Sequence, residues 1–217
     1  MKCCPLRILG LVLLLTAPGL ARAAEPLPNV AELVARDDQE ALRDLGPVVF
    51  PELARLYAGG DDDRKIRIAG IFYGLGRRSP EAEQVLLKDA HTTNPDLRIA
   101  VQYALGRVSD SEKVVNTLLE IMRNDGSPIF RDKAACALSY DQIHLTEAQK
   151  VRLYAGLIDA LADPKPQVQV IAITSLKILT GQDKGFRRSD PPKKKQLSTE
   201  AWRRWLAEYR AEYGANF

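Results

Sequence analysis

The sequence predicts an all-α protein whose short helices stack into a solenoid, and two observations carry this prediction. Segments of about 10 to 17 residues with helical spacing of apolar side chains alternate with short breaks carrying Gly, Pro, Asp, Asn or Ser, and no stretch keeps the alternation of a strand. One helical pattern also recurs along the chain. With 217 residues, 46% of them hydrophobic, the chain can bury the core of one domain.

The N-terminal residues 1–23 have the three parts of a secretory signal. Lys2 and Arg7 provide a positive start, residues 8–17 form an apolar run, and a small-x-small motif ends at Ala23, where we expect cleavage. Pro18 interrupts the apolar run well short of the roughly 20 residues that span a bilayer. The pattern therefore predicts export to the bacterial periplasm or beyond, without stable membrane insertion after cleavage. The alternative is an uncleaved anchor.

Removal of the signal changes the charge and the cysteine content. The full chain carries 31 basic and 28 acidic residues, and the signal removes Lys2, Arg7 and Arg22 but no acid, so the mature chain is near neutral. A near-neutral chain lacks the basic excess of a nucleic-acid-binding protein, and we expect no such partner. Cys136 is then the only cysteine, and its small apolar neighbours predict an inert, buried thiol.

Helix boundaries follow from capping residues and prolines. Ser79, Asn94 and Asp163 each precede a proline suited to the first helical position. Capping-box spacing occurs at Ser109, before Glu112, and at Thr146, before Gln149. The sequence predicts helices over residues 29–44, 47–58, 64–75, 80–91, 95–106, 110–124, 128–139, 146–162, 164–180 and 199–213.

The recurring pattern turns this series of helices into an architecture. Residues 98–106, RIAVQYALG, recur as 131–139 and again as 169–177, while 67–76 is a looser copy. A small residue followed by leucine falls in register at Leu75, Leu105, Leu138 and Leu176, at intervals of 30, 33 and 38 residues. Each interval holds two helices. Small residues let neighbouring helices approach closely and the leucine fills the layer between repeats, as a stack with one continuous core requires.

These copies resemble the HEAT-repeat family, in particular its short bacterial, PBS-lyase-like form. The Asp-rich turn at 61–63 precedes Arg67, and Asp96 precedes Arg98, as in that pattern. The resemblance covers about residues 28–180 and implies an α-solenoid of about five HEAT-type hairpins. It departs from the pattern where Gln169 replaces the arginine. The resemblance implies that Arg67, Arg98 and Arg131 bridge adjacent repeats; an anion-binding ladder is the alternative.

The C-terminal part has a pattern of its own. Residues 181–198, with a Pro-Pro pair and three lysines (193–195), are expected to form a linker after the solenoid at 24–180. In residues 199–217, Trp202 and Trp205 fall on one helical stripe. This segment is similar to the tail that closes many exported bacterial HEAT proteins, which implies a helix capping the last hairpin. An exposed aromatic recognition patch is the alternative.

A solenoid offers an elongated surface, expected to be the concave one formed by the second helix of each hairpin. These helices are expected to begin near residues 80, 110 and 146. Their outward positions mix charges of both signs, which favours a protein partner over a polyanion. The candidate partner-binding residues are Glu81, Gln84, Lys88, Lys113, Asn116, Glu120 and Arg123.

No catalytic residue, metal site or cofactor motif is predicted. His91 and His144 have no metal-type spacing to each other or to Cys136, and neither a phosphate-binding glycine loop nor a nucleophile elbow occurs. The sequence thus predicts a non-catalytic exported scaffold for protein–protein interaction. An enzyme subunit or accessory factor with a site assembled across repeats, or a brace in an envelope assembly, are the alternatives. The sequence leaves the partner and the oligomeric state open.

Overall fold

The structure, a computed structural model, describes residues 29–213, and these form helices without any strand. The predicted signal at 1–23 lies outside the described residues. Across 29–213, no helix combines the length and the apolar character needed to span a bilayer. The elements are α1 (Val30–Ala35), α2 (Gln39–Leu45), η1 (Gly46–Val49), α3 (Phe50–Ala58), α4 (Asp62–Leu75), α5 (Pro80–Lys88), α6 (Pro95–Val108), α7 (Glu112–Asn124), α8 (Pro128–Cys136), η2 (Ala137–Asp141), α9 (Glu147–Ala160), α10 (Pro166–Thr180) and α11 (Pro192–Tyr213).

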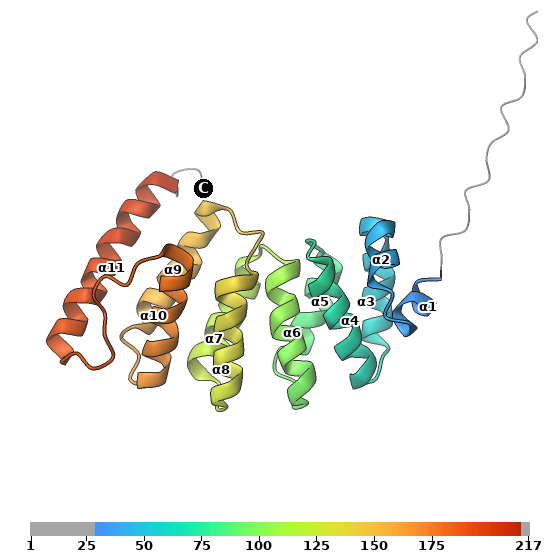
Figure 1. The fold of residues 1–217 in the computed structure, drawn as a ribbon, viewed down its shortest axis with the longest axis horizontal. Coiled ribbons are helices and arrows are strands. Elements are labelled where there is room, and N and C mark those ends of the chain that lie inside the picture. The colour runs from blue at the N-terminus through green and yellow to red at the C-terminus, as the bar shows by residue number, and fades with distance from the viewer. Residues whose placement is uncertain (1–28, 214–217) are drawn as a thin grey trace, which may run out of the picture.

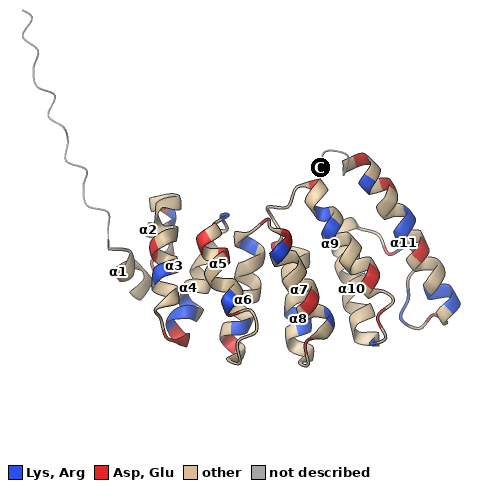
Figure 2. Cartoon of the chain, turned by 180° about the vertical axis from the view of Figure 1, so that it is seen from behind, with Lys and Arg blue, Asp and Glu red and all other residues tan. Residues whose placement is uncertain are grey.

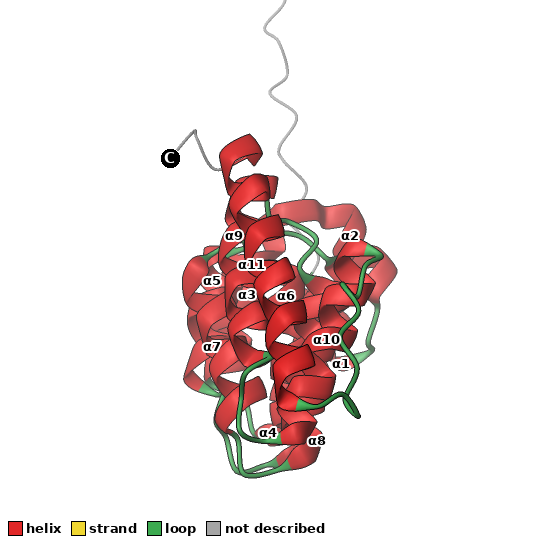
Figure 3. Cartoon of the chain, turned by 90° about the vertical axis from the view of Figure 1, so that its left-hand side faces the viewer, coloured by secondary structure: helices red, strands yellow, loops and turns green. Residues whose placement is uncertain are grey.

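The helices stand side by side in a row that follows the chain from α1 to α11 (Figure 1). The row has two layers. The first-helix layer contains α2, α4, α6, α8 and α10, each packed on the next. The second-helix layer contains α3, α5, α7, α9 and α11, in which α3 packs on α5, and α9 packs on both α7 and α11. Seen end-on, α5 and α7 lie on one side of the stack and α2 and α10 on the other (Figure 3). The predicted all-α solenoid is confirmed.

Several helices begin where their capping residues indicate. The Ser79 hydroxyl accepts a hydrogen bond from the Ala82 amide at 3.1 Å, and both bonds of the capping box at Thr146 and Gln149 are present. The predicted box at Ser109 is wrong, because the hydroxyl of Ser111 caps α7 instead. The Ser109 hydroxyl is already occupied as acceptor from the Ser111 amide at 2.9 Å.

Two predicted helices differ most from the observed ones. In addition, α10 begins at Pro166, with Lys165 as its N-cap, and not directly after Asp163. The helix expected over 29–44 is broken into α1 and α2, because Asp37 adopts a positive φ of 53° and the Asp38 carboxylate caps α2 by accepting from the Ala41 amide. Helix α11 starts at Pro192 rather than at 199, since proline is tolerated in a first turn and the following lysines are good helix formers. Lys195 therefore lies in α11, where its ammonium group donates to Gln169 at 3.0 Å.

The repeated leucines lie in the interior of the stack. Leu105, Leu138 and Leu176 are completely buried, and Leu75 is 9% exposed. Each follows a small residue, so the helices of the first layer approach one another closely around these side chains. The core that they join runs through the whole row, from Leu33 in α1 to Trp202 in α11. The stack is therefore held together by one elongated core, to which each repeat contributes through contact with its neighbours.

The motif arginines contact neighbouring elements. Arg67 donates to the Ala35 carbonyl at the end of α1, at 3.2 Å. Arg98 pairs with Asp125 after α7, and its guanidinium group lies 4.3 Å from the ring centre of Phe130. The Arg131 side chain is buried and donates to the Asp125 carbonyl at 2.6 Å and to Gln167 of α10. These contacts engage Arg98 and Arg131 inside the protein, which favours the bridging role over an anion-binding ladder.

Gly106 lies at a close approach between two repeats. A Cβ atom at this position would lie 2.7 Å from the Cβ of Asp141 and 3.1 Å from the Ala137 carbonyl oxygen. Both neighbours belong to η2, a π-helical turn that replaces the regular end of α8. The absence of a side chain at Gly106 therefore allows η2 to pack directly on α6, and Asp141 is buried there. Burial raises the pKa of the Asp141 carboxyl, although the nearby Arg107 opposes the shift.

Gly106→Ala is expected to lower the free energy of unfolding by about 1 to 3 kcal/mol, because the added methyl group overlaps with backbone and Cβ atoms that cannot rotate away. Gly70→Ala in α4 is the matched control. No atom lies within 4 Å of a Cβ at position 70, so alanine there should stabilise the helix by about 0.5 to 1 kcal/mol. Urea unfolding followed by circular dichroism measures both; equal effects would contradict this view of the α6–η2 contact.

Candidate binding groove

A groove lies on the second-helix layer, over α9 and between its neighbours α7 and α11. It consists of two adjoining hollows of about 270 and about 300 Å³, which share Arg152 and Ala155. We call it the α9 groove. Its lining residues are Glu112, Asn116, Leu119, Glu120, Arg123 and Asn124 of α7, Ala148, Gln149, Val151, Arg152, Ala155, Gly156 and Asp159 of α9, and Arg210 of α11.

Small residues on α9 create the groove. Ala148, Ala155 and Gly156 have the i, i+7, i+8 spacing that places residues on one helical face. At Gly156, α9 is in contact with α7, since a Cβ atom at this position would lie 2.3 Å from a methyl carbon of Leu119. Away from this contact, the short alanine side chains of α9 form the floor of the groove, and the longer side chains of α7 and α11 form its two walls. The result is an apolar floor with charged rims.

The charged groups of the rims are only partly neutralised within the protein. Arg152 donates through Nε to Oδ1 of Asn116 at 2.8 Å, which fixes the side chain and leaves its terminal nitrogens without a hydrogen bond to residues 29–213. Arg210 and Asp159 form no ion pair within that range. Neutral ligands would leave such groups unpaired, whereas charged side chains of a bound protein would pair with them.

Two other rim groups have weak partners. Nε of Arg123 lies 3.6 Å from a carboxylate oxygen of Asp163, whose side chain is buried. A carboxylate oxygen of Glu120 lies 3.7 Å from Nε2 of His91, and both side chains are more than half exposed. Glu120 is thus available to a ligand, and Asp163 offsets part of the charge of Arg123.

The structure brings together part of the predicted partner-binding set. Asn116, Glu120 and Arg123 line the α9 groove, and Lys113 is exposed on the same helix. The α5 residues Glu81, Gln84 and Lys88 are exposed but do not line the groove. The residues of α9 and α11 that line the groove were not predicted from the sequence. The spacing of Ala148, Ala155 and Gly156 was the signal that could have found them.

Helix α11 completes the groove because aromatic packing holds it against α9. Trp202 is fully buried, and the Trp205 ring contacts those of Trp202 and Tyr154 at centroid distances of 5.3 and 5.1 Å. The Tyr209 hydroxyl donates to the carboxylate of Glu147 at the start of α9. Burial, and then this bond, raise the pKa of the Tyr209 phenol. This aromatic cluster positions Arg210, the next residue, at the rim of the groove.

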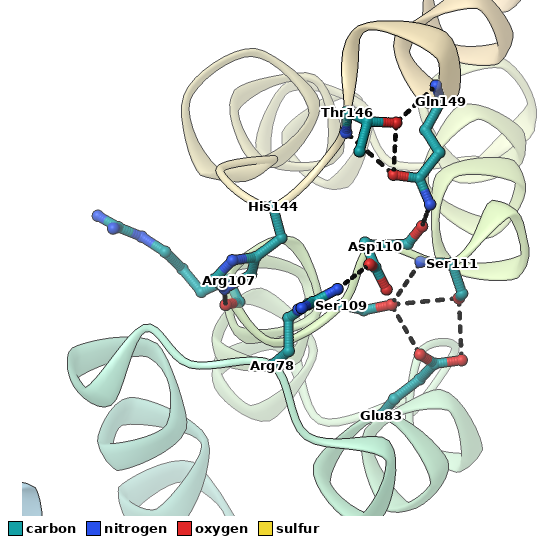
Figure 4. Close-up of polar contacts among 9 residues, drawn as sticks. All are labelled: Arg78, Glu83, Arg107, Ser109, Asp110, Ser111, His144, Thr146 and Gln149. Atoms are coloured by element: carbon teal, nitrogen blue, oxygen red, sulfur yellow. Dashed lines mark hydrogen bonds and ion pairs between the residues drawn. The ribbon is translucent and has the colours of Figure 1, made fainter. Parts of the chain in front are cut away.

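A separate polar cluster joins the turns of three successive repeats (Figure 4). The Glu83 carboxylate accepts hydrogen bonds from the hydroxyls of Ser109 and Ser111, at 2.7 and 2.9 Å. Gln149 of α9 donates to the Asp110 carbonyl at 3.0 Å. Nε2 of His144 lies 2.9 Å from the Arg107 carbonyl oxygen. The polar groups of this cluster form hydrogen bonds between one repeat and the next. We therefore assign the cluster a structural role.

The described residues offer no other arrangement with evident chemistry. Among residues 29–213, no group of three or more His, Cys, Asp or Glu side chains is placed to hold a metal ion. Cys136 is half-buried beside a hollow of about 190 Å³ between α8 and α10, on the first-helix layer. Burial raises the pKa of its thiol, which lowers its reactivity.

Comparison with known protein families decides the identity of the repeats. The family described as HEAT repeats matches residues 51–139, from the start of α3 into η2. Residues 51–139 are HEAT repeats. HEAT repeats generally serve as scaffolds for protein interaction. A search of curated proteins and a search of solved structures each gave no match. The two-layer stack continues past the matched segment through α9, α10 and α11, and the α9 groove lies where the matched and the unmatched parts meet.

Proposed function

We propose that this HEAT-repeat protein is a non-catalytic scaffold that binds a protein partner in the α9 groove. The observation that carries the proposal is the groove itself, a concave, apolar-floored surface with fixed and unpaired charged groups at its rims. Such a surface has the composition of a protein interface, in which apolar contact supplies affinity and charged rims supply orientation. The groove also lies on the layer of second helices, where a solenoid usually presents its binding surface.

Charge distribution supports a protein partner over nucleic acid. Basic and acidic residues are interspersed along the row of helices (Figure 2). The groove follows the same pattern: Arg152 and Arg210 are accompanied by Glu112, Glu120 and Asp159. A polyanionic backbone would meet repulsion from these carboxylates along with attraction from the arginines, and such binding normally needs a basic surface.

The proposed location is the bacterial periplasm or the exterior of the cell. The proposal rests on the N-terminal sequence pattern, which combines a basic start, an apolar run too short for a bilayer and a cleavage motif at Ala23. N-terminal sequencing of the protein recovered from the periplasmic fraction tests it. Recovery from the cytoplasm with Met1 or Lys2 as the first residue would contradict export.

Site-specific photo-crosslinking in the native envelope tests the binding function. A photoreactive amino acid in place of Glu120 lies in the α9 groove, and the same amino acid in place of Thr174 lies beside the α8–α10 hollow of the other layer. We expect one defined protein adduct from position 120 and none from position 174. Adducts from position 174 alone would assign binding to the first-helix layer and contradict the proposal.

A further inference from the structure

The unpaired charges of the α9 groove are separated by sign. One end contains Arg152 and Arg210, with Glu112 as the single acidic residue lining it. The nearby carboxylate of Glu147 does not compete for these arginines, because it accepts hydrogen bonds from Lys150 and Tyr209. The basic groups are therefore in excess at this end. Arginine binds a carboxylate through two parallel hydrogen bonds, and Arg152 is already held in place through Nε.

The other end has the opposite character. Glu120 and Asp159 line it from α7 and α9. The basic groups lining this end are Arg123, which lies 3.6 Å from the buried Asp163 carboxylate, and Arg152, which this end shares with the basic end. His91, beside Glu120, adds a full positive charge only when it is protonated. Acidic groups are in excess here, so this end would attract a cationic side chain.

The helix axis sets the separation of the two ends. Arg152 and Asp159 are seven residues apart on α9, which corresponds to about 10 Å along the helix at 1.5 Å per residue. An extended peptide covers the same distance in about three residues. The floor between the ends is formed by Ala155 and Gly156, so it accommodates small or apolar side chains.

We infer that the α9 groove takes an extended protein segment carrying an acidic side chain near Arg152 and Arg210 and a lysine or arginine about three residues away near Glu120 and Asp159. This inference rests on the proposed binding function and adds the chemistry of the partner. The separation of charges also fixes the direction in which the segment lies, because the reversed segment would place like charges together at both ends.

Selection from a phage-displayed library of random twelve-residue peptides tests the inference. The bait is the full mature chain, and selected peptides are then synthesised and titrated by fluorescence polarisation. We expect enrichment of Asp or Glu two to four residues from Lys or Arg. Reversing one charge, in Arg152→Glu, should weaken these peptides by about fivefold or more, since an exposed attraction becomes a repulsion. Lys177→Glu, an exposed α10 position on the other layer, is the matched control and should leave binding unchanged.

A second variant separates the inference from the function on which it rests. Ala155→Trp fills the floor shared by both hollows without changing any charge. Suppose that the selected peptides lack the charge pair, or bind Arg152→Glu as tightly as the unchanged chain, but no longer bind Ala155→Trp. This result would overturn the inference and leave the proposed binding function intact. If no peptide is enriched, or if the peptides still bind Ala155→Trp, both the inference and the proposed binding function are contradicted. An equal effect of Lys177→Glu and Arg152→Glu would also overturn the inference, by showing that only net charge matters.

Discussion

Replacement of Trp202 by alanine should lower the free energy of unfolding by about 3 to 5 kcal/mol, the usual range for a buried aromatic residue. Trp202 is fully buried, and its ring contacts that of Trp205, which in turn packs on Tyr154 of α9. The indole nitrogen has no hydrogen-bond partner among residues 29–213, so the loss comes from packing. Urea unfolding followed by circular dichroism and by the fluorescence of Trp205 measures the change.

Leu197→Ala provides the control on the same helix, because Leu197 is 58% exposed and its loss should change stability by no more than about 0.5 kcal/mol. Release of α11 would also remove Arg210 from the groove, so Trp202→Ala should weaken partner binding as well. Equal stability of Trp202→Ala and Leu197→Ala would contradict the docking of α11 on the last repeats.

Leu105→Ala should destabilise the protein by about 2 to 5 kcal/mol. Leu105 is fully buried on α6, which packs on α4, α8 and η2, so the cavity would lie between repeats rather than within one hairpin. Because each repeat of a solenoid depends on its neighbours, the same loss should also make the unfolding transition less cooperative. Calorimetry measures both effects.

The control for Leu105 is Ile129→Ala, which removes a side chain of equal volume that is 58% exposed at the start of α8. Its expected effect is within about 0.5 kcal/mol. A near-neutral result for Leu105→Ala would show that the small-then-leucine register does not define the contact between repeats.

The fold could be predicted from the sequence because its determinants are local and repeated. Apolar spacing fixed the helical class, and the recurrence at Leu75, Leu105, Leu138 and Leu176 indicated the stack. Capping residues such as Ser79 and Thr146 placed several helix starts correctly. The family match to residues 51–139 confirms the HEAT resemblance.

The features of the fold that were not predicted depend on interactions that local sequence patterns do not show. Asp38 caps α2 and breaks the first predicted helix, and Pro192 starts α11 inside the expected linker. The π-helical end of α8 packs against Gly106, which precedes Ala137 by 31 residues, and local spacing does not show such a contact. Helical patterns report which face is apolar, but the closeness of two helices follows from packing.

The candidate binding groove was predictable only in part for the same reason. Outward positions on α7 followed from its apolar stripe, and Asn116, Glu120 and Arg123 do line the groove, while their role in binding stays a prediction. The opposite wall required knowing that α9 and α11 are neighbours in the second-helix layer. The exposed α5 residues lie on the same layer but outside the groove, because exposure alone does not show where neighbouring helices leave a hollow.

Quantitative capture from the native envelope tests the central claim, that the α9 groove is the binding surface. The unchanged protein, Ala155→Trp and the matched Thr174→Trp, which fills the hollow on the opposite layer, would be crosslinked and compared by mass spectrometry. We predict that Ala155→Trp loses one specific protein that the unchanged chain and Thr174→Trp both capture, with circular dichroism unaltered. Undiminished capture by a folded Ala155→Trp variant would contradict the claim.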